Sequence, residues 1–299
     1  MTLGWGYPNK RAPYGARPIA RTIRLGCRYM CIWPIRLQWR KSYGIAGFRG
    51  ELERLSPETW AMTRSSRGKY ISRIALNMAW FEARQLVASP YRMHAAVGSS
   101  FPPDAVRQND EGRILWRLDE FSSNRSTWLY VVSPERPDFT HIVEQAGWPL
   151  HAEWEAKDYT PLLERIAQGQ CWQFKLRANP VRTAREDKGR RQRSSGIVGK
   201  VQGHVTVAQQ TKWLLDRAGK HGFRVLSEGE VADVVVSQRH RERFQRGGDT
   251  VTLTTVTFEG RLEVTDASAF RDTLCHGLGR AKGFGCGLMT VAPIRNDVA

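Results

Sequence analysis

The sequence contains no run of about 18 apolar residues, so no segment of it is a candidate transmembrane helix. Its most apolar stretch near the start, 25–35, is too short and contains Arg28, which also makes it a poor signal peptide. Cysteine is scarce: the five cysteines lack the spacing of a disulfide framework, which indicates reduced thiols and a cytoplasmic protein. Cys27 and Cys31 have no second pair nearby, so their spacing does not predict a zinc site.

Acidic residues are also few. The chain has 29 Asp and Glu against 46 Lys and Arg, a formal net charge of +17. A positive field of this size attracts polyanions, which are either nucleic acids or acidic membrane surfaces. A basic surface that serves only solubility is the alternative, but the imbalance favours nucleic acid.

The first 61 residues differ from the rest. They contain 11 Lys and Arg, no acidic residue before Glu51, and Trp, Gly and Pro without helical or strand periodicity. Three interpretations are open: a disordered basic arm, a targeting peptide, or a start codon assigned too far upstream. The last is favoured because Met62 stands shortly before the first clear strand. We therefore expect residues 1–68 to be a basic extension that is disordered or follows from a misassigned start.

Regular patterns begin at Lys69. Alternating residues predict a strand at 69–77, and Pro90 is suited to the first turn of a helix from about Tyr91. Residues 113–121 and 127–133 read as two strands joined by a polar turn, and a helix is expected around 138–146. Residues 154–166 are an edge strand or a linker. The predicted order is β-α-β-β-α.

The same order then repeats. We predict a strand at 171–179, a helix at 206–219, strand-rich segments at 223–244 and 250–266 around a tight turn at 246–249, a helix at 267–276 and a strand at 287–293. The predicted fold class is α+β, with two tandem ferredoxin-like (βαββαβ, RRM-like) domains at 69–160 and 161–299. This fold alone does not define a function.

A glycine-rich run, GLGRAKGFGCG, occupies 277–287 and contains Arg280 and Lys282. Glycines such as Gly279 and Gly285 allow close backbone approach to a ligand, so the run predicts a phosphate cradle. A tight helix-to-strand turn is an equally good interpretation. The spacing is not that of a P-loop, and the run precedes a strand, unlike a dinucleotide-binding fingerprint.

Two arginine-rich segments strengthen the nucleic-acid interpretation, because guanidinium groups suit phosphate oxygens. Solvated, flexible loops are the alternative. The first segment contains Arg177, Arg182, Arg185, Lys188, Arg190, Arg191 and Arg193, and the second contains Arg239, Arg241, Arg243 and Arg246.

Few residues are candidates for catalysis. The sequence has no carboxylate cluster typical of a metal nuclease, so we expect no metal and no cofactor. Asp119 and Glu120 are adjacent on a predicted strand and must point to opposite faces. Tyr91 and His94 share one helix face, where imidazole can transfer a proton and a phenol can orient a reactant. An ordinary surface pair at helical spacing is the alternative.

Six blocks of the sequence, taken in order, resemble the CasE family, the CRISPR repeat-processing endoribonucleases of type I-E systems. The blocks are SRIALN, SPYRMHAAV, ILWRLDEF, FKLRANPVR, VTFEGRLEV and GLGRAKGFGCGLMTVAP. The resemblance covers about Lys69 to Pro293. Residues 1–61 have no counterpart in it, which favours the misplaced start.

The resemblance implies a cytoplasmic, metal-independent endoribonuclease, monomeric when free. It would cut the repeat hairpin of precursor CRISPR RNA, stay bound to the guide RNA and join the other Cascade subunits. Tyr91 and His94 match the family's Tyr-x-x-His pair. The chemistry implied is attack of a ribose 2′-OH on the adjacent phosphorus, which leaves 2′,3′-cyclic phosphate and 5′-OH ends. A non-catalytic RNA-hairpin-binding subunit of the same complex is the alternative.

The resemblance also suggests roles. His94 would transfer the proton, and Tyr91 would orient the nucleophile or stabilise the phosphorane. Some relatives carry a lysine five residues after the histidine, where this chain has Ser99, so Arg92 or Lys282 is expected to supply the cation. The residues expected to contact RNA are Arg177, Arg182, Arg185, Lys188, Arg190, Arg191, Arg239, Arg241, Arg243, Gly279, Arg280, Lys282 and Gly285.

Overall fold

The computed structural model describes residues 68–121, 126–148, 154–183 and 201–294. The predictions for residues 1–67, and those for Arg185, Lys188, Arg190, Arg191 and Arg193, therefore lie outside the described residues. No helix in the described part of the chain is long and apolar enough to cross a membrane.

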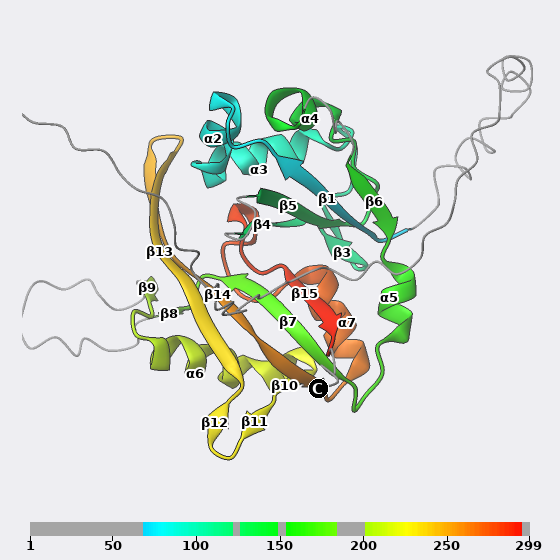
Figure 1. Ribbon diagram of the computed structural model, residues 1–299, viewed down its shortest axis with the longest axis vertical. Helices are drawn as coiled ribbons and strands as arrows, with labels where there is room; N and C mark the ends of the chain where they lie inside the picture. The colour runs from blue at the N-terminus through cyan, green and yellow to red at the C-terminus, as the bar shows by residue number, and fades with distance from the viewer. Residues whose placement is uncertain (1–67, 122–125, 149–153, 184–200, 295–299) are drawn as a thin grey trace, which may run out of the picture. The chain divides into compact units, whose positions relative to one another are not determined.

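The first sheet is antiparallel and has the strand order β4-β5-β1-β6 (Figure 1). Its strands are β1 (Tyr70–Leu76), β4 (Leu115–Phe121), β5 (Ser126–Ser133) and β6 (Glu155–Asp158). Buried residues alternate along β1, so one of its faces packs on helices. The helices that accompany the sheet are α2 (Phe81–Val87), α3 (Pro90–Ser99) and α4 (Thr140–Ala146).

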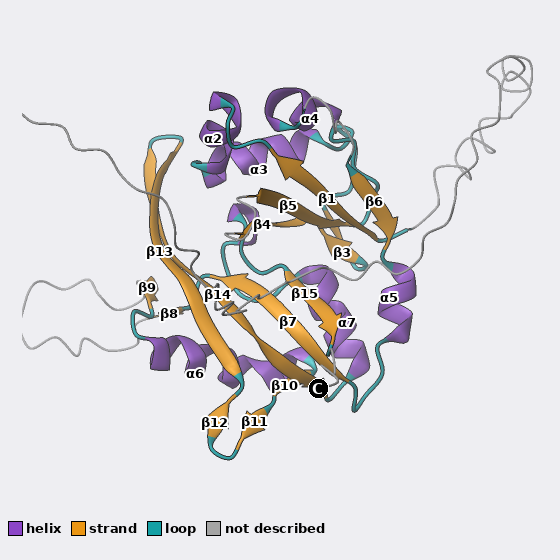
Figure 2. Cartoon of the chain, in the orientation of Figure 1, coloured by secondary structure: helices purple, strands orange, loops and turns teal. Residues whose placement is uncertain are grey.

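The second sheet repeats this arrangement, with the order β10-β14-β7-β15 (Figure 2). Its strands are β7 (Cys171–Ala178), β10 (Phe223–Val225), β14 (Asp249–Val264) and β15 (Met289–Pro293), and β13 (Val234–Arg246) also pairs with β14. Helices α6 (Val207–Ala218) and α7 (Ala267–His276) cover one face. Both sheets have the order 2-3-1-4 of a βαββαβ unit, which confirms the predicted tandem ferredoxin-like fold.

Local sequence explains where the helices begin. Thr206 and Gln209 form a capping box before α6, and the Asp266 side chain accepts a hydrogen bond from Ala269 N at the start of α7. Helix α3 has Pro90 at its first turn, as predicted. Helix α2 was not predicted, since its seven residues show too little periodicity.

Short elements join the main ones. They are β2 (Gln108–Asn109), β3 (Gly112–Arg113), α5 (Thr160–Arg165), β8 (Val181–Thr183), β9 (Val201–Gly203), η2 (Gly219–His221), β11 (Ser227–Glu228), β12 (Val231–Ala232) and η3 (Lys282–Phe284). The predicted edge or linker segment at 154–166 is both an edge strand, β6, and the helix α5. The β11–β12 hairpin divides the predicted strand-rich segment 223–244.

A buried polar network lies between the two sheets. Arg117 on β4 pairs with Asp119 at 2.8 Å, and both residues are almost fully buried. Its guanidinium also donates to the Lys175 and Leu288 carbonyl oxygens at 2.8 and 3.1 Å and to Thr290 Oγ1 at 2.8 Å. Since the last three residues belong to or adjoin the second sheet, Arg117 connects the two βαββαβ units. The exposed side chain of Glu120 confirms that Asp119 and Glu120 face opposite ways.

Candidate active site and nucleic-acid interface

Helix α3 presents Tyr91 and His94 to solvent. Met93 and Val97 bury the opposite face of the helix in the core, and the Ser89 side chain caps the first turn by accepting a hydrogen bond from Arg92 N. Tyr91 is 43% exposed, and His94 is also exposed. The two side chains therefore lie one helical turn apart, and both are accessible to a large ligand.

The glycine-rich run lies against His94, although 188 residues separate Lys282 from His94 in the sequence. A Cβ at Gly283 would be only 3.5 Å from His94 Cε1, and the Phe284 ring lies edge-on to the imidazole with centroids 6.1 Å apart. Trp116 Nε1 donates to the Gly283 carbonyl oxygen at 3.3 Å, which holds the run in place. The run and His94 therefore lie side by side.

Two glycines of the run are required by packing against tryptophan rings. Gly279 and Gly285 have φ of +88° and +73°, and a Cβ would lie 3.0 Å from Trp213 and 2.6 Å from Trp116. The positive φ angles and these contacts explain why glycine occupies both positions of a tight turn. RNA contacts of their backbone remain a prediction.

Cations surround His94. Partial burial and, after it, the charges of Arg107, Arg246 and Arg113 lower the pKa of His94 below its usual 6.5. Arg107 Nη1 lies 3.6 Å from the position of a Cβ on Gly98, one turn after His94 on the same helix. Arg246 lies over the Phe284 ring, 5.9 Å from its centroid. A neutral imidazole at neutral pH can accept a proton in this setting.

The two cations expected from the sequence lie in different surroundings. Arg92 hydrogen-bonds Gln85 on α2, and both line a shallow surface depression with Ser99. Lys282 is partly buried, and this burial, followed by the charge of Arg113, lowers its pKa. Neither Arg107 nor Arg113 was singled out in the sequence, because Arg107 stands alone in a polar segment and Arg113 begins a predicted strand. Only the tertiary structure brings their charges to His94.

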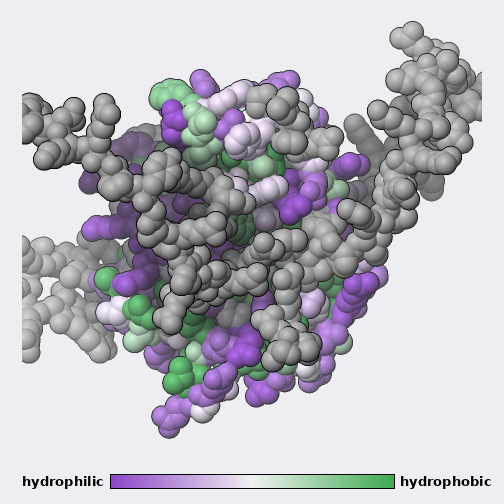
Figure 3. Space-filling model, viewed as in Figure 1, coloured by the Kyte–Doolittle hydropathy of each residue, from purple (hydrophilic) through white to green (hydrophobic). Residues whose placement is uncertain are grey.

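Strands β13 and β14 continue beyond the sheet as a two-stranded arm that ends in the turn at Gly247 and Gly248. Arg239, Arg241 and Arg243 are exposed on this arm, and Figure 3 shows its visible part as hydrophilic. Arg239 also donates to the Val205 carbonyl oxygen. The arm therefore offers a row of guanidinium groups, as expected for a surface that binds phosphates.

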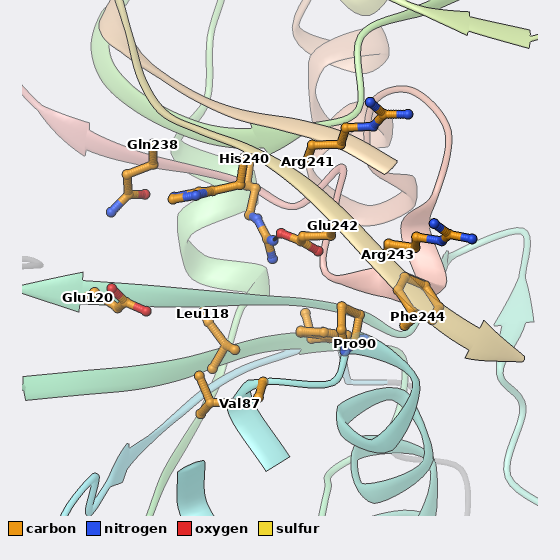
Figure 4. Close-up of a pocket in the computed structure, with 13 residues that line it drawn as sticks. Val87, Pro90, Leu118, Glu120, Gln238, His240, Arg241, Glu242, Arg243 and Phe244 are labelled. Atoms are coloured by element: carbon orange, nitrogen blue, oxygen red, sulfur yellow. Dashed lines mark hydrogen bonds and ion pairs between the residues drawn. The ribbon is translucent and has the colours of Figure 1, made fainter. Parts of the chain in front are cut away.

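A cleft of about 420 Å³ separates the arm from the junction of α2 and α3 (Figure 4). Arg177, predicted to contact RNA, lines this cleft and forms an ion pair with Glu242 on β13. The other predicted RNA contacts differ in setting: Arg280 is exposed, and exposed Arg182 donates to Gln202 Oε1 at 3.4 Å. Glu242 is a residue of this surface that charge counting missed, because an acid within an arginine-rich segment gives no nucleic-acid signal.

Comparisons with known proteins place these features in context. A family model described as CRISPR associated protein matches residues 69–293. The CRISPR-associated endoribonuclease Cse3 of Thermus thermophilus is 30% identical over 233 residues, covering 75% of this chain and all of that protein. The Cascade subunit CasE of Escherichia coli is 26% identical over 227 residues, with the same coverage. A structure of Thermus thermophilus Cse3 bound to an RNA representing a pre-cleavage complex has a TM-score of 0.61 and 28% identity, covering 76% of this chain and all of that one.

Proposed function

Because this chain belongs to the family of CRISPR-associated proteins, as the match over residues 69–293 shows, we propose that it is a metal-independent endoribonuclease that cleaves CRISPR repeat hairpins. It stays bound to the mature guide RNA and joins Cascade. The name of the Escherichia coli relative, a Cascade subunit, supports the second of these statements. The observation that carries the proposal is the contact of exposed His94 with the glycine-rich run, in the field of three arginines.

The reaction is an internal phosphoryl transfer. His94 accepts the proton of a ribose 2′-OH, whose oxygen forms a bond to the adjacent phosphorus while the bond to the 5′-oxygen breaks, and the departing 5′-oxygen takes a proton from solvent water. The products are a 2′,3′-cyclic phosphate and a 5′-OH. Because the nucleophile belongs to the substrate, the protein supplies alignment, proton transfer and charge stabilisation. Tyr91 orients the 2′-OH, and its exposure leaves room for the RNA backbone.

Arg107 is the cation best placed to stabilise the phosphorane. It has the largest effect of the three arginines on the pKa of His94, and its guanidinium lies beside Gly98, one turn after His94 on α3. Arg92, bound to Gln85, and Lys282, partly buried, are less suited to this role. Arg107 therefore compensates for Ser99 at the position where some relatives have lysine.

Cleavage of the cognate repeat RNA in EDTA tests the proposal. We expect one cut, with 2′,3′-cyclic phosphate and 5′-OH ends, under single-turnover conditions. A substrate with 2′-deoxyribose at the cleavage site should bind but stay intact, because it lacks the nucleophile. Tight binding of the all-ribose hairpin without any cut would instead identify a non-catalytic RNA-hairpin-binding subunit.

The arm should bind phosphates. Replacing Arg241 and Arg243 together by glutamine should weaken hairpin binding and reduce the slope of log Kd against log salt by about one for each phosphate that is no longer neutralised. Filter binding over a salt series measures both quantities. The pair Arg165→Gln and Lys220→Gln removes the same charge from exposed positions outside the arm and should leave the slope nearly unchanged. An unaltered slope in the arm variant would show that the arm does not face the RNA.

A further inference from the structure

We propose that the cleft between β13 and the α2–α3 junction binds one nucleobase beside the cleavage site, and that Glu242 selects a base with an exocyclic amino group. This inference rests on the proposed function, since it assigns a specificity-determining residue to the same RNA. It differs from the phosphate contacts of the arm, because phosphate contacts position a nucleic acid whereas base contacts specify its sequence.

A β-bulge aims Glu242 into the cleft. Between the pairs Ser237–Thr257 and His240–Thr255, strand β13 has one residue more than β14, and Gln238 has a φ of +44°. Before the bulge, Val236 lies opposite buried Phe258, on the face of the sheet covered by helices. Because of the extra residue, the even-numbered side chains of β13 after the bulge point to the opposite face of the second sheet, which faces the first sheet. Figure 4 shows His240 and Glu242 on the opposite side of β13 from Arg241 and Arg243.

The Glu242 carboxylate has one oxygen engaged and one unused. Oε1 pairs with Arg177 and accepts a hydrogen bond from Thr255 Oγ1 at 2.9 Å. Oε2 is shielded from solvent and has no hydrogen-bond partner among the described residues. Buried acceptors are normally satisfied, so this unused oxygen indicates a missing donor, which a ligand can supply once the Glu242 side chain turns the shielded oxygen into the cleft.

The wall of the cleft around Glu242 fits a base, whereas Arg177, Arg241 and Arg243, which also line the cleft, suit the phosphate of the same nucleotide. Glu242 is the only acidic residue of β13, and a carboxylate repels phosphate but accepts from base amino groups, as glutamate does from cytosine N4. Val87, Pro90 and Leu118 provide apolar surface on the opposite wall. A flat, apolar base face can pack there while its edge reaches Glu242.

The cleft adjoins the reaction site through two aromatic residues. Trp116 lines the cleft and donates to Gly283, which contacts His94. Phe244 also lines the cleft and packs on Phe284 with centroids 4.9 Å apart, and Phe284 in turn lies against His94. A base bound in the cleft therefore belongs to a nucleotide near the scissile phosphate.

The test is a double-mutant cycle between Glu242→Gln and deletion of single amino groups from the RNA. Each nucleotide flanking the cleavage site is replaced in turn by the analogue that lacks the amino group: inosine for guanosine, purine riboside for adenosine or pyrimidin-2-one riboside for cytidine. Hairpin binding and single-turnover cleavage are measured for every pair. At one position, we expect amino deletion to weaken binding by wild-type protein about tenfold and to have little further effect on Glu242→Gln.

Glu230→Gln is the matched control, because this exposed carboxylate lies on the turn between β11 and β12, at the other end of β13. It should discriminate between the RNAs as the wild type does. If Glu242 serves only to hold Arg177, Glu242→Gln will change the affinity for all analogues by one factor, and the inference is wrong. Wild-type protein that neither binds nor cuts the unmodified hairpin would contradict the proposed function itself.

Discussion

Replacing His94 by alanine is expected to reduce single-turnover cleavage of the repeat hairpin by roughly 10²- to 10⁴-fold, the usual contribution of a positioned proton-transfer group. Binding of the hairpin should change little, because the phosphate contacts that we propose are made by the arm and not by α3. Met93 and Val97 keep α3 in the core, so the exposed His94 side chain can be removed without loss of packing. Cleavage and binding of the same labelled hairpin separate the two effects.

His276→Ala is a suitable control, since this histidine, although it directly precedes the glycine-rich run, hydrogen-bonds the backbone carbonyl oxygens of Asp272 and Asn109. It should cleave at the wild-type rate. The pH profile of the wild type provides a second test of His94. Because the pKa of His94 is lowered from 6.5, kcat/KM should rise through a value below 6.5 and then level off as the imidazole becomes neutral. Undiminished cleavage by His94→Ala would remove His94 from the mechanism.

Local patterns were sufficient to predict most of the elements. Alternation in β1, Pro90 before α3 and the turn at 246–249 are signals carried by neighbouring residues, and each of these elements is present. The repeated order of elements then led to the tandem ferredoxin-like fold. Helix α2 and the β11–β12 hairpin were missed because short elements depend on tertiary contacts more than on their own periodicity.

The site was less predictable, because its geometry depends on contacts between distant parts of the chain. Counting arginines treated Arg177 as a free cation, whereas Glu242, 65 residues later, pairs with it. The proximity of Gly283 to His94 also depends on the packing of the two sheets. The bulge at Gln238 decides which side chains of β13 face the cleft, and no local signal in the sequence indicated that extra residue.

The largest expected effect on stability follows from Asp119→Asn. Asp119 is almost fully buried beside Arg117 and 3.7 Å from Lys175, which also pairs with Glu259 at 3.0 Å. Removing the carboxylate charge breaks the buried Arg117–Asp119 ion pair, which typically costs about 3–5 kcal/mol, and we expect a loss of that size. Guanidinium chloride unfolding of both proteins at neutral pH measures the difference. Glu120→Gln, at the next and exposed position of β4, should change the free energy of unfolding by no more than about 0.5 kcal/mol.

The pH dependence distinguishes a lost charge from a packing defect. Burial raises the pKa of Asp119, but the Arg117 charge and hydrogen bonds, with those of Lys175, outweigh it and hold the pKa below 3.8. A carboxylate whose pKa is lowered in the folded protein stabilises it above the unfolded value, and this stabilisation disappears as the pH falls through the folded value. The difference in the free energy of unfolding between the wild type and Asp119→Asn should therefore become smaller in strong acid. If this difference in the free energy of unfolding instead stays constant down to strong acid, a packing defect and not the lost charge beside Arg117 accounts for the loss of stability.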